Sequence, residues 1–534
     1  VRREAFRKLT PVIKGNKICP LDKVTISTAT TTQEITGSQE LFRAIIDRNV
    51  RHFHQATETP FAQKPLVDIL PPFRIDSSIN EALLQGDISN FHEQSNIIKD
   101  LLSNLNRLPS VNQIPSDIST EEFIQGIKRV KEGKSSSLSG RHYSLYKAMA
   151  SFPFTTDLMV TLINQCVNNS IMLTRWRKVL QVMLCKVPGN YELEKLRVIQ
   201  LIEADLNMYL RLVWGKRLVN NALQHNLFPA EQFGNHPGVQ SGSAALLKTV
   251  STDLIRLLRA NATIFNNDAK ACYDRIIPGF SQICCQSLGL PQKAAAFMLQ
   301  FLLSAEYHVR TAYGISEEFF SNLSKAVFGV LQGSGSAPAI WLAVSIILIR
   351  NYNKKFASEG TPNPTRTDFL TKLLDAFVDD TDLYDIVLDP NITTHTLAER
   401  MQQRAQFWEK SLFATGGKLN FKKCYWYLIQ WKWDEDGQPS LKTSTEAPAD
   451  LALTYGGSSH STTICRKEPN EALKTLGFWS APTGQQKTQL SETKTTLHHI
   501  AKNIHATPMT HLEGRLLIPV YLHSKLRYIF AATS

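Results

Sequence analysis

The stretch 376–386, AFVDDTDLYDI, places four acidic side chains among apolar residues. Asp379 and Asp380 are adjacent, and Asp382 and Asp385 follow at short intervals. An ionised carboxylate is strongly disfavoured among apolar groups unless a cation compensates its charge. Hard oxygen ligands suit Mg²⁺, which also binds substrate phosphates. We therefore interpret Asp379 and Asp380 as metal ligands, and we expect Asp382 and Asp385 to face solvent farther along the strand.

A third acid completes the candidate site. The segment NDAKACYDRI (267–276) contains Asp268 at the end of a predicted strand, and we expect its second acid, Asp274, to cap the following helix. Two strands that place Asp268 beside Asp379 and Asp380 would hold two Mg²⁺ ions. Metal ions roughly 4 Å apart can stabilise both the attacking and the leaving oxygen of an in-line phosphoryl displacement. The acids therefore predict phosphoryl transfer.

The elements that must position these acids follow from local patterns. A capped helix is predicted to begin at Ser119 or Thr120, because acidic residues follow in its first turn and apolar residues recur at helical spacing. A Gly/Ser-rich loop opens a long apolar helix in 328–352, and 373–388 is predicted to be a strand hairpin. Further strands are predicted at 179–187, 196–202 and the start of 261–276, and further helices at 205–225, 240–260, 394–415 and through most of the last sixty residues.

Bulk properties narrow the class of protein. The 534 residues carry a net charge of +12, which favours a polyanionic partner such as nucleic acid. The eight cysteines form no CxxC pair, which disfavours a zinc knuckle and fits a reducing compartment, so we expect an intracellular protein of the nucleus or cytoplasm. The longest apolar run, 339–349, is too short to cross a bilayer, and no membrane partner is expected. Because the chain begins at Val1 and not at Met, we expect a fragment or a processed product.

In their order along the chain, DAKACYD (268–274), LQGSGSAP (331–338) and FVDD (377–380) resemble motifs A, B and C of reverse transcriptases. The resemblance is greatest to the enzymes of non-LTR (LINE-type) retrotransposons, and it covers roughly residues 116–530. The segment STEEFIQGIKRVKEGKSSSLSGRHYSLYKA (119–148) resembles the family's entry segment, and WRKVLQVMLCKVPG with EKLRVIQLIEADLNMYLRL (176–212) is similar to its fingers pattern. GGKLNFKKCYW (416–426) resembles motif D, LKTLGFW (473–479) motif E, and GRLLIPVYLHSKLRY (514–528) the start of the thumb. The chain departs from the usual pattern in RVIQL where RPISL is common, and in Val378 where alanine is common.

The resemblance implies an α+β fold of the right-hand polymerase type, with fingers, palm and thumb and an antiparallel palm sheet backed by helices. It predicts an N-terminal extension at 1–115, fingers at 116–255, a palm at 256–470 and the start of a thumb at 471–534. We expect the extension to be wrapped on the main body, because it mixes short apolar and polar segments with scattered prolines.

Further site residues are implied by motif position. Asp268, Asp379 and Asp380 are the expected catalytic metal ligands, and the backbone carbonyl of Ala269 is a further ligand for Mg²⁺, with Mn²⁺ as an alternative ion. Lys423 takes the motif D position, where a lysine can protonate the leaving pyrophosphate. Its neighbour Lys422 leaves that assignment open by one residue.

Five residues are expected to contact the nucleotide. Lys186 and Arg197 lie on two predicted fingers strands, where basic side chains can hold triphosphate oxygens. Gln332 and Gly333 begin the motif B loop, where small residues allow close approach of a nucleotide or template. Tyr273 is expected beneath the incoming sugar, where its ring would exclude a 2′-hydroxyl; the alternative is a core aromatic. The aromatic series at 425–433 is expected to fill the strand core in preference to stacking on bases.

These residues predict RNA-directed DNA polymerisation, with an RNA template, a DNA primer and dNTPs as partners. Two alternatives stay open: a non-catalytic scaffold that keeps the polymerase shape to bind RNA, and an RNA-dependent RNA polymerase. Retained acids and the QG loop disfavour the scaffold, and Tyr273 disfavours the RNA polymerase. The sequence indicates no particular protein partner.

Overall fold

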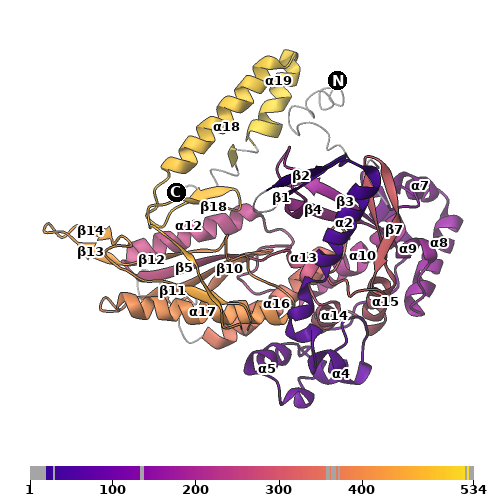
Figure 1. Cartoon of the computed structure of the whole chain (residues 1–534), viewed down its shortest axis with the longest axis horizontal. Helices are drawn as coiled ribbons and strands as arrows, with labels where there is room; N and C mark the ends of the chain where they lie inside the picture. Colours follow the sequence, from indigo (N-terminus) through magenta and orange to yellow (C-terminus); the bar gives the residue numbers. More distant parts are fainter. Residues whose placement is uncertain are drawn as a thin grey trace.

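The structure is a computed structural model that describes residues 20–27, 31–132, 137–356, 361–362, 369–370, 373–456, 458–523 and 526–527. Helices and small sheets alternate along this chain, which confirms a mixed helix and sheet architecture (Figure 1). The right-hand polymerase arrangement stays a prediction. Four residues of the predicted fingers segment, 133–136, lie outside the described residues.

A five-stranded sheet in the order β10-β11-β5-β12-β17 forms the centre of the molecule. Its strands are β5 (Asn261–Asp268), β10 (Leu374–Phe377), β11 (Asp380–Val387), β12 (Tyr425–Ile429) and β17 (Cys465–Lys467). The first four pair antiparallel, whereas β17 runs parallel to β12. β5 is buried along most of its length, as expected for a strand with neighbours on both edges and helices against the sheet. The predicted strand at 261–268 and the predicted hairpin at 373–388 are confirmed.

Helices cover both faces of this sheet (Figure 1). α16 (Ala337–Phe356) packs on α17 (Thr394–Ala414), which contacts β5 and β11, while α12 (Ser241–Leu258) lies on the opposite face. Trp426, Tyr427 and Trp431 are buried, so these members of the aromatic series lie in the core, whereas Trp433 is exposed. The predicted helices at 240–260, 328–352 and 394–415 are therefore confirmed, and they form the layers that hold the sheet.

The expectation that Asp382 and Asp385 face solvent is wrong. Both side chains are buried, and they point to opposite faces because residues alternate along a strand. Asp385 accepts hydrogen bonds from Arg400 and Arg404 of α17, at 2.7–3.1 Å. Asp382 pairs with Lys248 of α12, with 2.9 Å between Nζ and Oδ2. The basic partners of both aspartates lie elsewhere in the sequence. The pattern of the strand therefore gave no cation that could pair with these carboxylates, and it predicted that they face solvent.

A second sheet has the order β4-β3-β6-β7. It consists of β3 (Lys178–Cys185), β4 (Leu196–Leu201), β6 (Glu306–Thr311) and β7 (Gly314–Ser321). The strands predicted at 179–187 and 196–202 are confirmed as an antiparallel pair, and β6 joins β3 in parallel.

Nearby helices are α6 (Thr120–Arg129), α7 (Tyr143–Met149), α8 (Pro153–Asn168), α9 (Thr174–Arg177), α10 (Ala204–Leu212), α11 (Val219–Gln224), α13 (Cys272–Arg275), α14 (Pro278–Ser287) and α15 (Gln292–Ser304). A π-helical turn, Val213–Leu218, connects α10 to α11. Ser119 caps α6 through a capping box with Glu122, as the sequence predicted.

The N-terminal part of the described chain packs on the second sheet and on helices of the main body. α2 (Ser38–Phe53) contacts β6, β7 and α13, while α5 (Asn96–Ser103) contacts α16 and α17 and α4 (Ser77–Leu84) contacts α14. This part of the chain also contains β1 (Val24–Ser27), β2 (Thr32–Ile35), α3 (Leu66–Ile69) and three short 3₁₀ helices. The described part of the predicted extension thus lies against the main body, although the domain boundaries themselves stay predictions.

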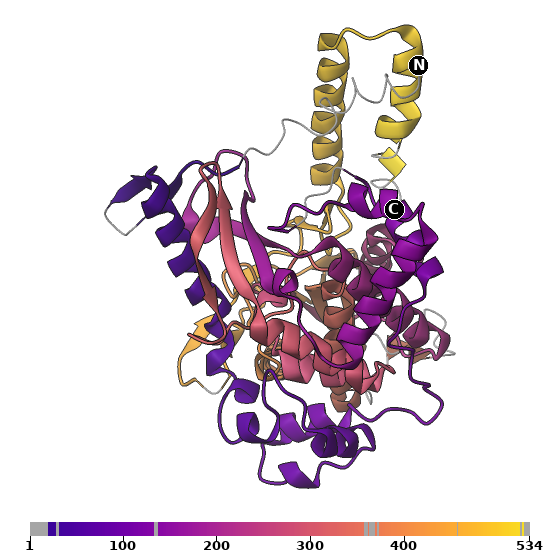
Figure 2. The same cartoon turned by 90° about the vertical axis from the view of Figure 1, so that its right-hand side faces the viewer.

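Short hairpins and two projecting helices make up the C-terminal part. The hairpins pair β13 (Trp431–Trp433) with β14 (Pro439–Leu441), β15 (Ala452–Thr454) with β16 (Ser461–Thr463), and β18 (Leu473–Thr475) with β19 (Phe478–Ser480). α18 (Lys487–Ala506) and α19 (His511–Leu517) project together from the rest of the molecule (Figure 2). A π-helical turn, Ile518–Leu522, follows α19, and a further short pair is β8 (Thr361–Pro362) with β9 (Phe369–Leu370). Across the described ranges, no helix combines the length and apolar character needed to cross a membrane.

We expect Asp385→Asn to lower the free energy of unfolding by about 3 kcal/mol, because it leaves the guanidinium groups of Arg400 and Arg404 without their buried carboxylate. Urea denaturation measures the change. Glu34→Gln is the matched control: its exposed pair with Lys23 is screened by solvent and should contribute little to stability. Equal losses in the two variants would contradict the assigned role of Asp385.

Candidate active site

The two acids of the FVDD segment lie at a tight turn. Val378 and Asp379 form the two-residue connection between β10 and β11, in which Phe377 pairs with Asp380. Val378 has a φ of +62°, a left-handed conformation that a β-branched residue rarely adopts. The Trp341 indole donates a hydrogen bond to the Val378 carbonyl, at 2.6 Å. Packing therefore holds a strained turn in place, and backbone strain of this kind persists only where surrounding structure fixes it.

Gly234 supports the same turn from the other side. A Cβ atom at this position would lie 2.2 Å from the Val378 nitrogen, so only glycine allows the approach. The neighbouring Phe233 donates its N–H to the Ala376 carbonyl, at 2.8 Å, which joins this segment to the edge of β10. Segment 231–234 and α16 together determine where Asp379 points.

The pairing of β5 with β11 brings the third acid to this turn. Asp268 and Asp380 are direct partners in the antiparallel register. Burial, together with the negative charges of Asp379 and Asp268, raises the pKa of Asp380 to about 6. Burial and the charge of Asp268 also raise the pKa of Asp379. The structure therefore gathers the three predicted acids into one region in which their charges oppose one another.

Lys423 supplies a nearby positive charge. Its Nζ lies 3.2 Å from both carboxylate oxygens of Asp268. The segment that carries it is held beside β5 by an isolated bridge between Ala269 and Leu419, flanked by hydrogen bonds from Asn420 N–H to the Asp268 carbonyl and from Lys270 N–H to the Lys418 carbonyl. The Ala269 carbonyl takes no part in this bridge. Of the two adjacent lysines, Lys423 is the one that the structure places on the acids.

A cleft with a volume of about 780 Å³ opens in front of these residues. The predicted site residues that line it are Asp268, Ala269, Asp379, Lys423, Lys186, Arg197, Tyr273 and Gln332. Lys186 follows β3 directly and Arg197 lies on β4, so the second sheet forms one wall. Partial desolvation and the positive charges of Lys423 and Arg197 lower the pKa of Lys186. A concentration of cations opposite carboxylates is suited to a ligand that carries both phosphates and a bound metal.

Two predicted residues lie slightly apart from this cleft. Asp380 lines a small cavity behind the turn, and Gly333 lines a neighbouring cavity beside Arg211. Gly333 adopts a φ of +124°, and a Cβ there would lie 2.6 Å from the Gln200 carbonyl. The Gln332 carbonyl accepts a hydrogen bond from the Gln200 N–H, at 2.8 Å, so this loop docks directly on β4. The close approach that Gly333 allows is therefore to the protein's own backbone.

Tyr273 forms part of the floor of the cleft. It is partly buried and lies edge-on to Trp341, with ring centroids 6.5 Å apart. Burial raises the pKa of its hydroxyl. Gly329 packs so closely on this segment that a Cβ would lie 2.8 Å from the Tyr273 carbonyl oxygen. The ring is thus both packed from behind and exposed to the cleft, so the two sequence interpretations of Tyr273 are compatible.

The helix-cap interpretation of Asp274 is wrong. Asp274 lies within α13 and is buried, and its Oδ2 is 2.9 Å from Nε2 of His52 on α2. Arg48, His52 and Gln55 also line the cleft, and sequence reasoning missed them. Arg48 and His52 are spaced i, i+4 on α2, which puts them on one side of the helix and was the available signal, whereas Gln55 follows the helix in a 3₁₀ turn. Nothing in the sequence indicated that this side faces the acids.

The donor set fits the predicted metal. Mg²⁺ is usually held by one or two carboxylates together with substrate phosphates, and Asp268 and Asp379 both face the cleft. Burial and mutual repulsion raise the pKa values of Asp379 and Asp380, and a bound cation would balance the negative charge that is disfavoured there. Within the described ranges, no three His, Cys, Asp or Glu side chains lie close enough together to surround an ion by themselves.

Comparison with known proteins finds no family model that matches the chain and no curated protein that matches it.

In the presence of a metal chelator, we expect the free energy of unfolding to decrease as the pH rises from about 4 to about 6. Over this range the folded state keeps a proton on Asp380 that the unfolded chain has already lost. Asp380→Asn should remove this part of the slope, and the effect is the difference between the two urea-denaturation profiles across pH. Parallel profiles for the wild type and the variant would contradict the raised pKa.

Proposed function

We propose that this protein is an RNA-directed DNA polymerase that extends a primer 3′-hydroxyl with deoxynucleotides. The observation that carries the proposal is the register of β5 against β11, which sets Asp268 opposite Asp380 and beside Asp379 at the mouth of a cationic cleft. The order of the motifs along the chain adds the resemblance to reverse transcriptases of the non-LTR type. The mixed helix and sheet architecture is compatible with the right-hand polymerase fold that this resemblance implies.

The residues of the cleft divide the reaction among them. Asp268 and Asp379, with the Ala269 carbonyl, would hold two Mg²⁺ ions, while Asp380 supports them from behind. When bound, these ions lower the pKa of the attacking hydroxyl and stabilise charge on the leaving oxygen. Catalysis by the chain itself is then mainly positioning and electrostatic stabilisation.

Cationic side chains orient the nucleotide. Arg197 and Lys186 stand on the wall opposite the acids, where they can hold the triphosphate oxygens of a dNTP as the primer oxygen attacks the α-phosphate. Lys423 is paired with Asp268. From this position the Lys423 ammonium would donate a proton to the departing pyrophosphate.

Tyr273 favours DNA as the product. Its ring lies edge-on to Trp341, and Gly329 packs closely on its backbone, so the residue cannot retreat without strain. A ribose 2′-hydroxyl pressed against it would meet an unyielding apolar face. This distinguishes the proposal from an RNA-dependent RNA polymerase, while a non-catalytic scaffold would bind primed RNA and extend nothing.

The test is primer extension on an RNA template with Mg²⁺, with dNTPs and rNTPs compared. We expect dNTP incorporation and its loss by more than a hundred-fold in Asp379→Asn, because one ligand charge of a site worth several kcal/mol is removed. Asp389→Asn is the matched control: this exposed aspartate follows the same strand and should leave the rate unchanged. Extension by Asp379→Asn at the wild-type rate would exclude the assigned site, and preference for rNTPs would favour the RNA polymerase.

The two adjacent lysines allow a second prediction. Lys423→Met should slow single-turnover extension by roughly a hundred-fold or more and remove the decline in rate at high pH, since a general acid is lost. Lys422→Met should change neither, because Lys422 is exposed and its neighbour makes the contact with Asp268. The reverse result would assign the general acid to Lys422.

A further inference from the structure

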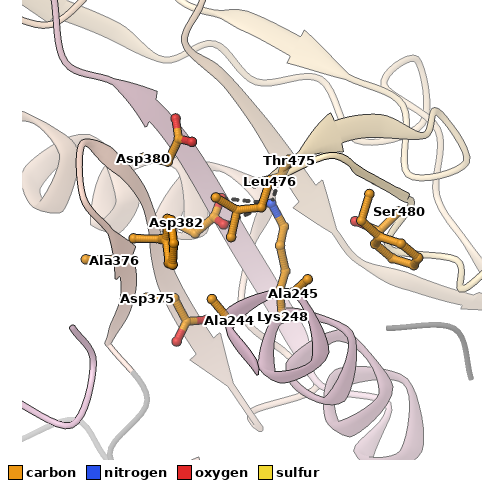
Figure 3. A pocket seen from close by; sticks show the side chains of 12 residues that line it. Ala244, Ala245, Lys248, Asp375, Ala376, Asp380, Asp382, Thr475, Leu476 and Ser480 are labelled. Carbon is orange, nitrogen blue, oxygen red and sulfur yellow. Dashed lines mark hydrogen bonds and ion pairs between the residues drawn. The ribbon is translucent and has the colours of Figure 1, made fainter. Parts of the chain in front are cut away.

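A buried lysine lies behind the catalytic turn, on the sheet face that carries Asp380 and Asp382. Figure 3 shows Lys248 rising from α12 between the strand of Asp382 and the hairpin β18–β19. Its ammonium donates to Asp382, at 2.9 and 3.1 Å from the two carboxylate oxygens, and to the Thr475 hydroxyl, at 3.0 Å. Three acceptors therefore satisfy the three donors of the ammonium. One contact of Lys248 is with the strand of the acids, and the other is with the hairpin.

The surrounding polar groups extend this link in both directions. The Asn266 side chain of β5 donates a hydrogen bond to Oδ1 of Asp382, at 2.8 Å. The Tyr425 hydroxyl of β12 lies 3.3 Å from the Thr475 hydroxyl. A buried ion pair often adds little to the free energy of unfolding, because apolar residues of similar volume can replace it without loss of stability. The specific feature of this pair is its geometry, since it ties strands of the central sheet to a separate hairpin.

The hairpin β18–β19 borders the cavity of Asp380. Thr475 and Leu476 line that cavity together with Asp380. The turn between the two short strands is tight, with Leu476 at a φ of +53° and Gly477 at +84°. Phe478 packs on Ala245 of α12, one turn from Lys248. The position of the hairpin relative to Asp380 is therefore fixed through α12, and Lys248 is the charged part of that attachment.

We propose that Lys248 is a positioning residue for polymerisation: it fastens the hairpin β18–β19 to the strand of Asp380 and so holds both in place behind the catalytic turn. This inference rests on the proposed function. Lys248 lies outside the cleft and touches neither Asp268 nor Asp379 in the contacts described above, so its action on the reaction is indirect, through the strand of Asp380 and the hairpin that it joins. Small displacements of reacting groups have large effects on rate, which makes such an attachment consequential.

Two variants separate attachment from charge and from folding. Lys248→Met with Asp382→Asn removes both buried charges, keeps an acceptor for Asn266 and takes away the donor to Thr475. Thr475→Val removes the same link from the hairpin side and leaves the ion pair intact. Tyr427→Phe is the matched control, because it deletes a nearby hydrogen bond, from the Tyr427 hydroxyl to the Glu471 carbonyl, that does not involve Lys248.

Two measurements on the full chain are needed: hydrogen exchange of amides 473–480, and single-turnover extension of primed RNA with dNTP affinity measured separately. We expect faster exchange in both link variants, an extension rate lowered roughly ten-fold or more, and unchanged dNTP affinity. Tyr427→Phe should keep the wild-type values. Combining all three link substitutions should slow extension no further than either variant alone.

Unchanged exchange in the hairpin would overturn the attachment, and faster exchange with a wild-type extension rate would overturn its role in catalysis. Loss of rate only in the charge-removing variant would also overturn the proposal, since it would assign the effect to the field of the ion pair at Asp380. If the wild-type protein extends no primer, the proposed function fails and the catalytic role of Lys248 fails with it. The exchange data still decide the attachment in that case.

Discussion

Charge compensation around β11 is the constraint on which the central sheet depends. This strand and its turn carry acids on both sheet faces, and burial makes each of them unfavourable unless a cation lies nearby. α17 neutralises Asp385 with two arginines, and α12 neutralises Asp382 with Lys248. The two helices thus serve as more than apolar covers. Cationic side chains of the protein compensate the negative charges of Asp379 and Asp380 less fully, and burial and repulsion raise the pKa of both. This uncompensated charge distinguishes a candidate site from a structural ion pair.

The local elements of this fold could be predicted from the sequence because they depend on neighbouring residues. Ser119 caps its helix with a glutamate three residues later, and the hairpin at 373–388 follows from its apolar and aromatic residues on either side of the acids. The partners of Asp382 and Asp385 could not be predicted in this way. Lys248 is 134 residues from Asp382, and no local pattern records which lysine of a helix will face a distant strand.

The candidate site shows the same division. The metal-ligand hypothesis identified Asp268, Asp379 and Asp380 from type and order, and the structure brings them together, although Asp380 faces a separate cavity. The contribution of α2 was missed because His52 meets Asp274 across 222 residues. Motif matching also gave no reason for the glycine at 234, whose importance depends on the strained turn that it touches.

The strand order has a consequence for how the chain is made. β3 cannot pair with β6 until β6 has been synthesised, more than a hundred residues later. The same holds for β5, whose partners β11 and β12 follow over a similar span. The two sheets are interleaved along the chain, so neither can close from a contiguous segment emerging from the ribosome. Such non-local pairing is slow and leaves unpaired strand edges exposed meanwhile. We therefore expect a fragment that ends between β5 and β6 to lack partner strands in both sheets and to aggregate.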